Sequence, residues 1–313
     1  MLIKIQNLAM KVGQLAMTKK KHNIGMLFNT QKKEAIHMAK KLYSWGDENS
    51  INFMIPPHEA AVINVPETVD KIWKETVDFA VILGGDGTFL RAARYSLGYK
   101  IPLYGINLGR LGFLATGCPK SAIDDIKIIM NKNYSLQQRS VLNGHVIREN
   151  RVVHELHALN DFIISNSALA RVIDLEVKIE TEILSLYIGD GLILSTPTGS
   201  TAYALSTGGP IIPPHVPCLL LAPICPHSLY TRPVVLSSTD VLTVTPKGNA
   251  HNLVLTQDGQ LGYDILPGDK VEVKLDPKLH VYTIELEGRS YYDTLKKKLR
   301  WGFNAISDGG DWV

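Results

Sequence analysis

The chain has 313 residues, 45% of them hydrophobic, and a formal net charge of +3 at pH 7. This length allows one large domain or two of ordinary size with an ample core, and the composition excludes a disordered chain. Part of the basic excess lies in two short runs, residues 19–21 and 296–300. Such runs are typical of solvated surfaces, so no nucleic-acid partner is expected.

The cysteines, Cys118, Cys218 and Cys225, are odd in number and show no C-x-x-C spacing. This argues against a disulfide framework and a zinc site and fits a reducing compartment, so a cytoplasmic location is expected. No apolar stretch approaches the roughly 20 residues of a membrane span, and polar residues interrupt any signal-peptide core. We therefore expect no membrane partner. Residues 1–21 resemble an extension, with Met17 as an alternative start whose use the intact mass would reveal.

Strands and helices alternate in the first third of the sequence. Strands are expected at residues 24–28, 51–55, 79–83 and 101–106, and helices at residues 33–44 (stopping at Gly46) and 89–95. The run at 79–83 is continuously apolar, as in central parallel strands that are covered on both faces. This succession predicts an open, doubly wound α/β sheet.

After a helix expected at residues 121–130, short strands separated by turn residues dominate the sequence. Strands are expected at residues 173–179, 183–188, 192–195, 241–245, 253–256, 271–275 and 281–286. We therefore predict a C-terminal, mainly antiparallel β domain, and a last helix at 291–301 that returns to the first domain. The predicted organisation is an extension (1–21), an α/β phosphate-binding domain (22–125 with 287–313) and a β-rich domain (126–286).

A glycine loop follows the buried strand at residues 79–83. Gly84, Gly85 and Gly87 let the backbone approach a phosphate and turn its N–H groups toward it. The helix that follows adds its positive N-terminal dipole, with Thr88 as the expected N-cap, and Arg91 one turn later could reach the same anion. The sequence therefore predicts a phosphate site at this loop.

Asp86 is the unusual member of the loop. A carboxylate beside phosphates repels them unless it binds a metal ion or accepts a proton from an attacking hydroxyl, so Asp86 points to phosphoryl transfer. The alternative is a tight turn without a ligand, because Asp-Gly pairs are common in turns. Neither a Walker loop nor a G-x-G-x-x-G fingerprint is present.

Residues 189–203 crowd hydroxyl side chains around three glycines and a proline, and the small residues 204–210 follow. Such a segment is poor core material but offers hydrogen bonds to ribose hydroxyls, base edges and a pyrophosphate. The alternative is a long polar loop that binds nothing.

The runs GGDGTFLRAAR, ALND, GDGLILSTPTGSTAYALSTGGP, PICPHSL with RP, and DGQ, in that order, resemble the NAD kinase family from about residue 23 to residue 301. Phosphofructokinases and diacylglycerol and sphingosine kinases share the glycine loop, whereas the segment at 190–210 is particular to NAD kinases. The resemblance implies transfer of the ATP γ-phosphoryl to the 2′-hydroxyl of the adenosine ribose of NAD, with Mg²⁺ bridging the phosphates. It also implies a homodimer or homotetramer, with the β-rich domain binding NAD.

The resemblance assigns roles to single residues. Asp86 is similar to the family's proton acceptor and lines the NAD site together with Gly87, and Arg91 is similar to a nearby binding position. Asn160 and Asp161 match an Asn-Glu pair that contacts NAD, although Asp161 is one methylene shorter than the more common Glu.

Further NAD contacts are implied along the β-rich domain. Arg171 lies where the family often places a ligand-contacting basic residue, with a polar strand end as the alternative reading. Asp190 is similar to a residue that recognises an amide or amino group of the dinucleotide. The DGQ turn supplies Asp258 and Gln260, whose family contact is often made across subunits. The adenine and ribose segment is Thr201, Ala202, Tyr203, Ala204, Leu205 and Ser206. No side chain is assigned as a metal ligand.

Two rival functions remain open at this stage. A lipid kinase with the same glycine loop would need an apolar acceptor cleft, which the hydroxyl-rich residues 195–206 do not suggest. A non-catalytic NAD(P)-sensing module would bind the dinucleotide without turnover, and Asp86 in an intact glycine loop argues against it. The donor, ATP alone or also polyphosphate, and the acceptance of NADH stay open as well.

Overall fold

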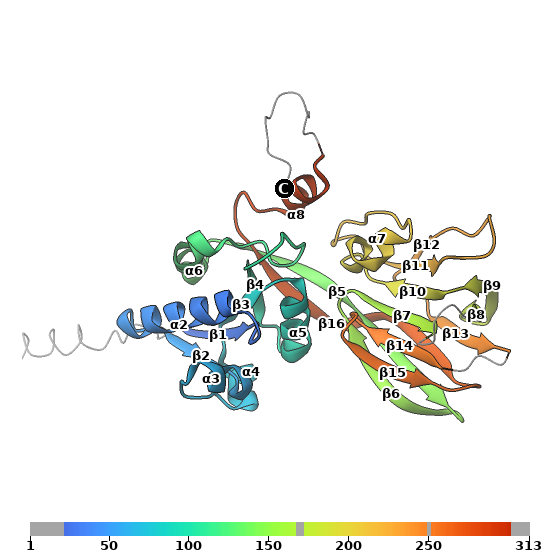
Figure 1. Ribbon diagram of the computed structural model, residues 1–313, viewed down its shortest axis with the longest axis horizontal. Helices are drawn as coiled ribbons and strands as arrows, with labels where there is room; N and C mark the ends of the chain where they lie inside the picture. Colours follow the sequence, from blue (N-terminus) through green and yellow to red (C-terminus); the bar gives the residue numbers. More distant parts are fainter. Residues whose placement is uncertain (1–21, 167–171, 249–251, 302–313) are drawn as a thin grey trace, which may run out of the picture.

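A computed structural model describes residues 22–166, 172–248 and 252–301, and it shows a helix-covered half joined to a β-rich half (Figure 1). The first half confirms the predicted α/β domain. Its elements are β1 (Asn23–Phe28), α2 (Lys33–Glu48), β2 (Asn52–Met54), α3 (Pro57–Ile63), α4 (Asp70–Thr76), β3 (Phe79–Gly84), α5 (Asp86–Ser96), β4 (Pro102–Asn107), η1 (Pro119–Ser121) and α6 (Ala122–Met130).

The strands of this half lie parallel in the order β2-β1-β3-β4. Successive residues of β3 point to opposite faces of the sheet, so Val81 packs in one apolar cluster with α2 and α6, whereas Ile82 packs in another with α4 and α5. Helices therefore cover both faces, as the continuous apolar run predicted. Buried on both sides, β3 holds the glycine loop on a rigid support.

Helix α2 runs past Gly46 to Glu48, so the stop predicted at Gly46 is wrong. A Cβ on Gly46 would collide with the ring of Phe53 in β2. The glycine thus permits close packing between helix and strand, and the helix ends at Glu48 with Asn49 as its C-cap.

The β-rich half begins with a long strand of 14 residues, which pairs with the last strand of the chain. Its elements are β5 (Ser135–Arg148), β6 (Arg151–Ala158), β7 (Asp161–Asn166), β8 (Ile173–Ile179), β9 (Glu182–Gly189), β10 (Gly191–Ser195), η2 (Gly199–Thr201), α7 (Tyr203–Ser206), β11 (Cys218–Ile224), β12 (Val234–Ser237), β13 (Leu242–Lys247), β14 (Leu253–Gln257), β15 (Leu261–Ile265), β16 (Lys270–Glu285) and α8 (Tyr291–Leu299). Residues 271–275 and 281–286, predicted as two strands, are one strand with an irregularity between Leu275 and His280.

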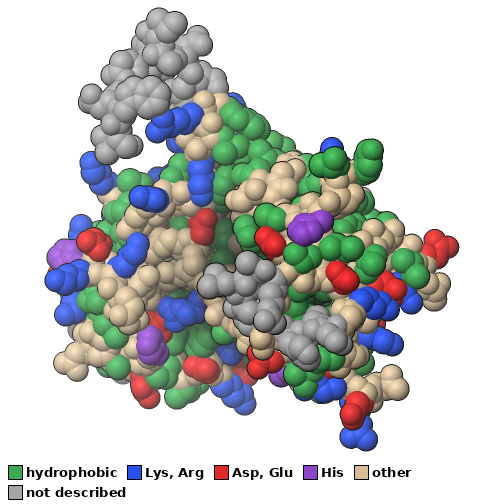
Figure 2. All heavy atoms as spheres, turned by 45° about the vertical axis from the view of Figure 1, so that its right-hand side comes forward, with side chains coloured by type: hydrophobic (Ala, Val, Ile, Leu, Met, Phe, Trp, Pro, Cys, Tyr) green, Lys and Arg blue, Asp and Glu red, His purple; other side chains and the backbone are tan. Residues whose placement is uncertain are grey.

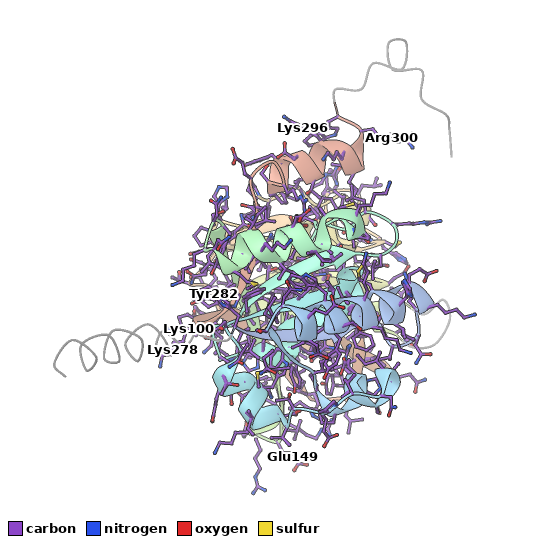
Figure 3. All side chains as sticks on the ribbon, turned by 90° about the vertical axis from the view of Figure 1, so that its left-hand side faces the viewer. Lys100, Glu149, Lys278, Tyr282, Lys296 and Arg300 are labelled. Carbon is purple, nitrogen blue, oxygen red and sulfur yellow. The ribbon has the colours of Figure 1, made fainter. Side chains whose placement is uncertain are left out.

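Strand β16 joins the two halves into one sheet. Its end pairs with β4 in parallel, with Tyr282 opposite Pro102, and its beginning pairs with β13 in antiparallel fashion, with Val273 opposite Leu242. Figure 3 places Tyr282 near Lys100, just before β4. Among the described residues a 10-stranded sheet results, with the order β2-β1-β3-β4-β16-β13-β8-β9, with β5 paired to β16 and β6 paired to β5.

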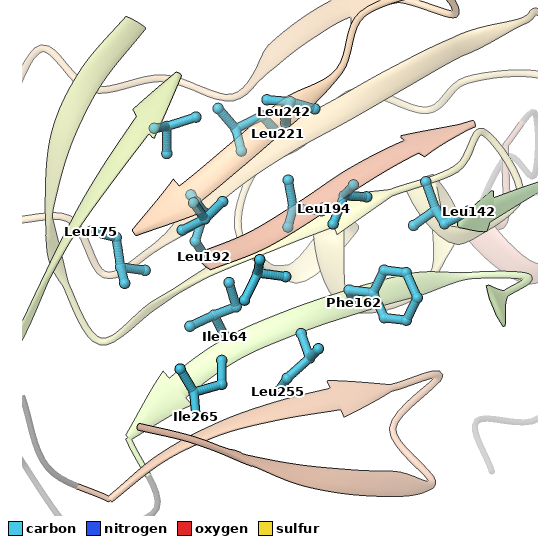
Figure 4. Close-up of a cluster of buried hydrophobic side chains, with 14 of the residues drawn as sticks. Leu142, Phe162, Ile164, Leu175, Leu192, Leu194, Leu221, Leu242, Leu255 and Ile265 are labelled. Atoms are coloured by element: carbon cyan, nitrogen blue, oxygen red, sulfur yellow. The ribbon is translucent and has the colours of Figure 1, made fainter. Parts of the chain in front are cut away.

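A second, antiparallel sheet packs on the β-rich part of the first. Its order is β12-β11-β10-β7-β14-β15, six strands within the described residues. Alternate residues of its strands, such as Phe162, Leu192 and Leu194, meet Leu175 and Leu242 of the larger sheet in the core between the two (Figure 4). This confirms the predicted β domain as a sandwich.

The C-terminal segment returns to the first half, as predicted. Arg289, which follows β16, forms an ion pair with Asp125 of α6 and donates hydrogen bonds to Tyr104 and Ser121. Helix α8 begins with a capping box formed by Ser290 and Asp293. It then packs Tyr291 and Leu295 on Phe113, close to the glycine loop.

Candidate active site

The glycine loop joins β3 to α5 at the carboxyl edge of the parallel strands. Gly85 is the N-cap in an extended conformation, and the helix begins at Asp86. The N-cap predicted at Thr88 is therefore wrong. Thr88 lies within the first turn, where its N–H donates to the Gly85 carbonyl and its side chain packs against Gly84. The helix begins earlier than the Thr88 hydroxyl led us to predict, because the chain turns into the helix at Gly85.

The Asp86 carboxylate is held by the loop that follows β4. Oδ2 accepts the N–H of Phe113 at 2.8 Å, and Oδ1 accepts the N–H groups of Leu114 at 3.0 Å and Ala115 at 3.2 Å. An ionised carboxylate has about four lone-pair sites, so these contacts orient Asp86 and leave room for a further donor. This loop was not singled out from the sequence, since apolar residues give no sign that their backbone holds a carboxylate.

A buried cation, Arg139 of β5, lies within electrostatic reach of Asp86. Its side chain is 6% exposed, and Nε donates a long hydrogen bond of 3.4 Å to Thr283. Burial lowers the pKa of Arg139 to about 10, while the negative charges of Glu285 and Asp86 oppose that shift. Arg139 therefore places a buried positive charge within electrostatic reach of Asp86, a feature that sequence reasoning missed.

A cavity of about 510 Å³ opens at the glycine loop, between the loop after β1 and the turn after β14. It is lined by Asn29, Thr30, Gln31, Lys32, His58, Gly85, Gly87, Thr88, Arg91 and Gln260. Backbone N–H groups at the start of α5, amide side chains and the basic side chains form an environment suited to an anion. A larger cavity, about 750 Å³, lies between α6 and the segment before α8 and shares no lining residue with this one.

Arg91 lines the cavity, but its guanidinium is anchored to two residues that do not line the cavity. Its Nη2 forms an ion pair with Glu59 Oε1 at 2.6 Å and donates a hydrogen bond to the Phe28 carbonyl at 2.9 Å. Glu59 is almost fully buried, so the pair fixes the guanidinium in one place. The structure thus brings Arg91 to the predicted anion site, held by a carboxylate that the sequence did not reveal.

Asn160 and Asp161 lie at the start of β7, where the DGQ turn is tied to them. The Asp258 carboxylate accepts the N–H groups of Asn160 at 2.7 Å and Asp161 at 3.3 Å, and also that of Leu159. Burial raises the pKa of Asp258, and these N–H groups together with Arg94 act in the opposite direction. Two predicted NAD-binding segments that are about a hundred residues apart therefore form one unit.

Asp161 is a buried acid. Its residue is 3% exposed. Burial, with a further contribution from the charge of Asp258, raises its pKa to about 7. Along β7 Asp161 alternates with Phe162, so it shares a face with Ile163, which packs against Ala204. Asp161 therefore faces the side of the sheet that carries the hydroxyl-rich segment.

The hydroxyl-rich segment folds back on Asn160. Thr196 N–H and Ser195 Oγ both donate to the Asn160 carbonyl, and a Cβ on Gly199 would collide with that carbonyl. The next residues, Thr201 and Ala202, are half-buried, and Ala204 is buried in a cluster with Ile193. Tyr203 and Ser206 are exposed, and Leu205 is half-buried between them. The structure thus brings residues 201–206 to the side of the sheet that Asp161 faces.

Gln260 and Arg94 link this unit to the glycine loop. Gln260 Nε2 donates to the Gly87 carbonyl at 2.7 Å, and Arg94 Nη2 donates to Gln260 Oε1 at 2.6 Å. Arg94 Nη1 also lies 3.6 Å from Asp258 Oδ2. These contacts are made within one chain. Arg94 was not singled out from the sequence, since a second arginine in a helix matches any solvated face.

Asp190 lies apart from this group of residues. In β10, Ser195 pairs with Asp161 and Gly191 pairs with Ser165, so Asp190 stands at the opposite end of the strand, roughly 16 Å from Ser195 at about 3.3 Å per residue. A hydrogen bond from the Cys225 thiol to Asp190 raises the pKa of that thiol. Arg171, the other predicted contact in this region, lies outside the described residues.

Two family models match the chain. The ATP-NAD kinase N-terminal domain matches residues 24–134, and the ATP-NAD kinase C-terminal domain matches residues 159–285. The NAD kinase of Natranaerobius thermophilus is 36% identical over 283 residues, which are 90% of this chain and 98% of that protein. The NAD kinase of Solibacter usitatus is 41% identical over 228 residues, 73% of this chain and 79% of the relative.

Solved structures share the fold. The crystal structure of yeast NADH kinase complexed with NADH has a TM-score of 0.83 at 24% identity and covers 94% of this chain and 91% of its own. The crystal structure of an NAD kinase from Archaeoglobus fulgidus in complex with ATP has a TM-score of 0.70 at 22% identity and covers 89% of this chain and 98% of its own.

A glycine loop with an acid at the carboxyl edge of a doubly wound sheet, linked through the 258–260 turn and Asn160 to a hydroxyl-rich segment on a β sandwich, identifies a phosphotransferase with an alcohol group as acceptor. The family matches, which span most of the chain, make the class specific: the chain belongs to the NAD kinase family. Within the described residues, no helix is both long and apolar enough to cross a membrane.

Proposed function

We propose that Asp86 is the proton acceptor in the phosphorylation of NAD by ATP, and that the two substrates meet at the glycine loop. The hydrogen bonds from Phe113, Leu114 and Ala115 that orient the Asp86 carboxylate at the start of α5 carry this proposal. The 2′-oxygen of the adenosine ribose attacks the γ-phosphorus of ATP, and the bond from that phosphorus to the β–γ bridging oxygen breaks. ADP leaves, and the hydroxyl proton passes to Asp86.

The 510 Å³ cavity at the glycine loop is assigned to the ATP phosphates. The N–H groups at the start of α5 and the side chains of Lys32 and Arg91 supply positive charge there. The face of the second sheet that carries Asp161 and residues 201–206 is assigned to the adenosine of NAD. The two regions adjoin at Gln260, which lines the cavity and belongs to the DGQ turn.

Mg²⁺ is proposed to arrive with ATP. Among the described residues there is no group of three His, Cys, Asp or Glu side chains that could hold a metal ion. Asn29, Gln31 and Thr88 line the cavity and carry side-chain oxygens, so they would be the residues closest to such an ion or its water molecules. When bound, the ion offsets the charge that develops on the phosphates.

Association into a homodimer or homotetramer is part of the proposal. Strand β9 is a sheet edge in the described part of the chain and exposes Ile183, Leu186 and Ile188, next to a loop where Leu229 and Tyr230 are 85% and 92% exposed. Hydrophobic side chains reach the surface of this half in Figure 2. An apolar edge strand favours pairing with another chain.

Asp190 lies at the same end of the molecule, because the backbone N–H of His227 donates to Ile188 and that of Asp190 donates to Ile224. An assembly through this surface would carry Asp190 toward a partner's dinucleotide. Sedimentation equilibrium tests the assembly: a Leu229→Ser/Tyr230→Ser variant is expected to dissociate at concentrations where the native chain is associated. A native chain that stays monomeric at every concentration contradicts it. A cytoplasmic location is proposed from the free cysteines, and cell fractionation tests it.

The central experiment incubates the purified chain with ATP, Mg²⁺ and NAD and detects NADP enzymatically. Asp86→Asn is expected to lower kcat by about 10²- to 10⁴-fold, whereas Asp124→Asn, on the exposed face of α6, serves as the matched control. Activity of Asp86→Asn within about threefold of native contradicts the assignment. Binding of NAD without turnover would favour a sensing module, and phosphorylation of diacylglycerol a lipid kinase.

A further inference from the structure

We propose that Arg94 is a positioning residue, which fixes the turn carrying Asp258 and Gln260 against the first turn of α5. This inference rests on the proposed function. Arg94 touches neither assigned substrate region directly in the described contacts, and it acts through the residues that it holds.

The guanidinium joins two functional segments from one helix. Arg94 lies two turns beyond Asp86 in α5, and its Nη2 donates to Gln260 Oε1 at 2.6 Å. Its Nη1 is 3.6 Å from Asp258 Oδ2, a distance at which the attraction is electrostatic. Among the described residues Nη1 is buried and has no hydrogen-bond partner, so the charge of Asp258 is its main compensation.

The contact also determines which way the Gln260 amide points. A guanidinium only donates, so the atom that faces Arg94 must be the amide oxygen. The amide nitrogen then faces Gly87, whose carbonyl accepts one of its hydrogens at 2.7 Å. Its second hydrogen remains, and Gln260 lines the cavity assigned to the phosphates. Arg94 therefore sets the donor that Gln260 presents beside the glycine loop.

Arg94 is also connected, through Asp258, to the region assigned to NAD. Asp258 has a positive φ of 51°, a backbone conformation that residues other than Gly rarely adopt. Its carboxylate accepts the N–H groups at the start of β7. Arg94 lies against this carboxylate and against Gln260 together. Loss of the Arg94 side chain should loosen the position of the glycine loop relative to Asn160, although no side chain that contacts a substrate is removed.

The test is a double-mutant cycle with the full chain. Arg94→Met, Gln260→Met and the combined variant are compared with native in kcat, in KM for each substrate and in the midpoint of thermal unfolding. Arg94→Met is expected to lower kcat/KM for NAD by about 10- to 100-fold, the effect of losing one charge-assisted hydrogen bond. The combined variant should lose at most about threefold more than the larger single loss, because both changes remove the same link.

Two further variants sharpen the test. Arg94→Lys keeps the positive charge, but an ammonium group lacks the rigid guanidinium fork that holds both Gln260 and Asp258. Arg94→Lys should therefore recover only part of the kcat/KM that Arg94→Met loses. Arg151→Met removes an exposed arginine on β6 and serves as the control. Arg94→Met activity within about threefold of native, or a combined loss equal to the product of the single losses, overturns the proposal. If Arg94→Met does not fold, Arg94→Lys takes its place in the cycle. A native chain that forms no NADP would instead reject the proposed function.

Discussion

Gly112 lies directly against the Asp86 carboxylate, and a Cβ at Gly112 would collide with both oxygens and with Cγ of that side chain. The two residues are far apart in the sequence, yet one determines whether the other can keep its orientation. The hydrogen bonds from Phe113 and Leu114 to Asp86 require this close approach.

Gly112→Ala is therefore expected to displace Asp86 and lower kcat by about 100-fold, since a misplacement of roughly 1 Å can cost that much. Gly262→Ala on β15, where the added Cβ makes only an ordinary contact with Val254, is the matched control. The measurement is steady-state NADP formation together with circular dichroism. Unchanged kcat in a folded Gly112→Ala protein would show that the orientation of Asp86 does not matter.

Gly85→Ala tests the phosphate cavity. A Cβ at Gly85 meets no protein atom within 4 Å, and its backbone conformation is open to alanine, so folding should be unaffected. The methyl group would enter space assigned to the ATP phosphates and raise KM for ATP by about tenfold, comparable to the loss of one good contact. Calorimetric affinity for NAD alone should stay within a factor of about two of native. An unchanged KM for ATP would place the phosphates elsewhere.

Asp161→Asn tests the buried acid through the pH dependence of stability. The folded state raises the pKa of Asp161 from 3.8 to about 7, so folding favours the protonated form. Below pH 4 both states bind the proton and there is no penalty. As the pH rises from 4 through 7 the native chain loses stability relative to Asp161→Asn, by at most about 4 kcal/mol above pH 7. Urea unfolding at pH 5 and pH 8 measures the change, and a pH-independent difference contradicts it.

Arg289→Met tests the anchor of the C-terminal segment. It leaves Asp125 buried without its cation, which typically costs about 3 to 5 kcal/mol. Lys127→Met removes the exposed partner of Asp124 in the same helix and should change stability by less than about 1 kcal/mol. Denaturant unfolding of both variants checks the contrast. Equal effects would mean that the Arg289 contacts do not hold α8 to the first half.

The sequence was sufficient for elements whose pattern is local. The apolar run of β3, the glycines after it and the alternation in β8 identified both domains and the phosphate loop. The sequence was insufficient for elements whose structure depends on contacts with residues far along the chain. The elements that were not predicted are the strands β5, β6, β7, β11, β12 and β15 and the helices α3, α4 and α7.

The candidate site divides in the same way. Asp86, Gln260 and Asn160 stand in short, recognisable runs, and the structure brings their segments together. Arg94 and Arg139 carry no local signal, because their roles come from pairing with residues far along the chain. Asp190 carries a recognisable signal, but its distance from the other site residues follows from the register of β10, which no local pattern encodes.

The position of β16 has a consequence for synthesis. This strand lies beside β4 in the sheet that supports the glycine loop, yet it is encoded in the last fifth of the chain. While the ribosome makes the protein from its N-terminus, β4 remains an open sheet edge until residue 283 has emerged. In nascent chains and C-terminally truncated products, the sheet that supports the glycine loop should therefore lack β16, and the open edge of β4 should need protection from aggregation.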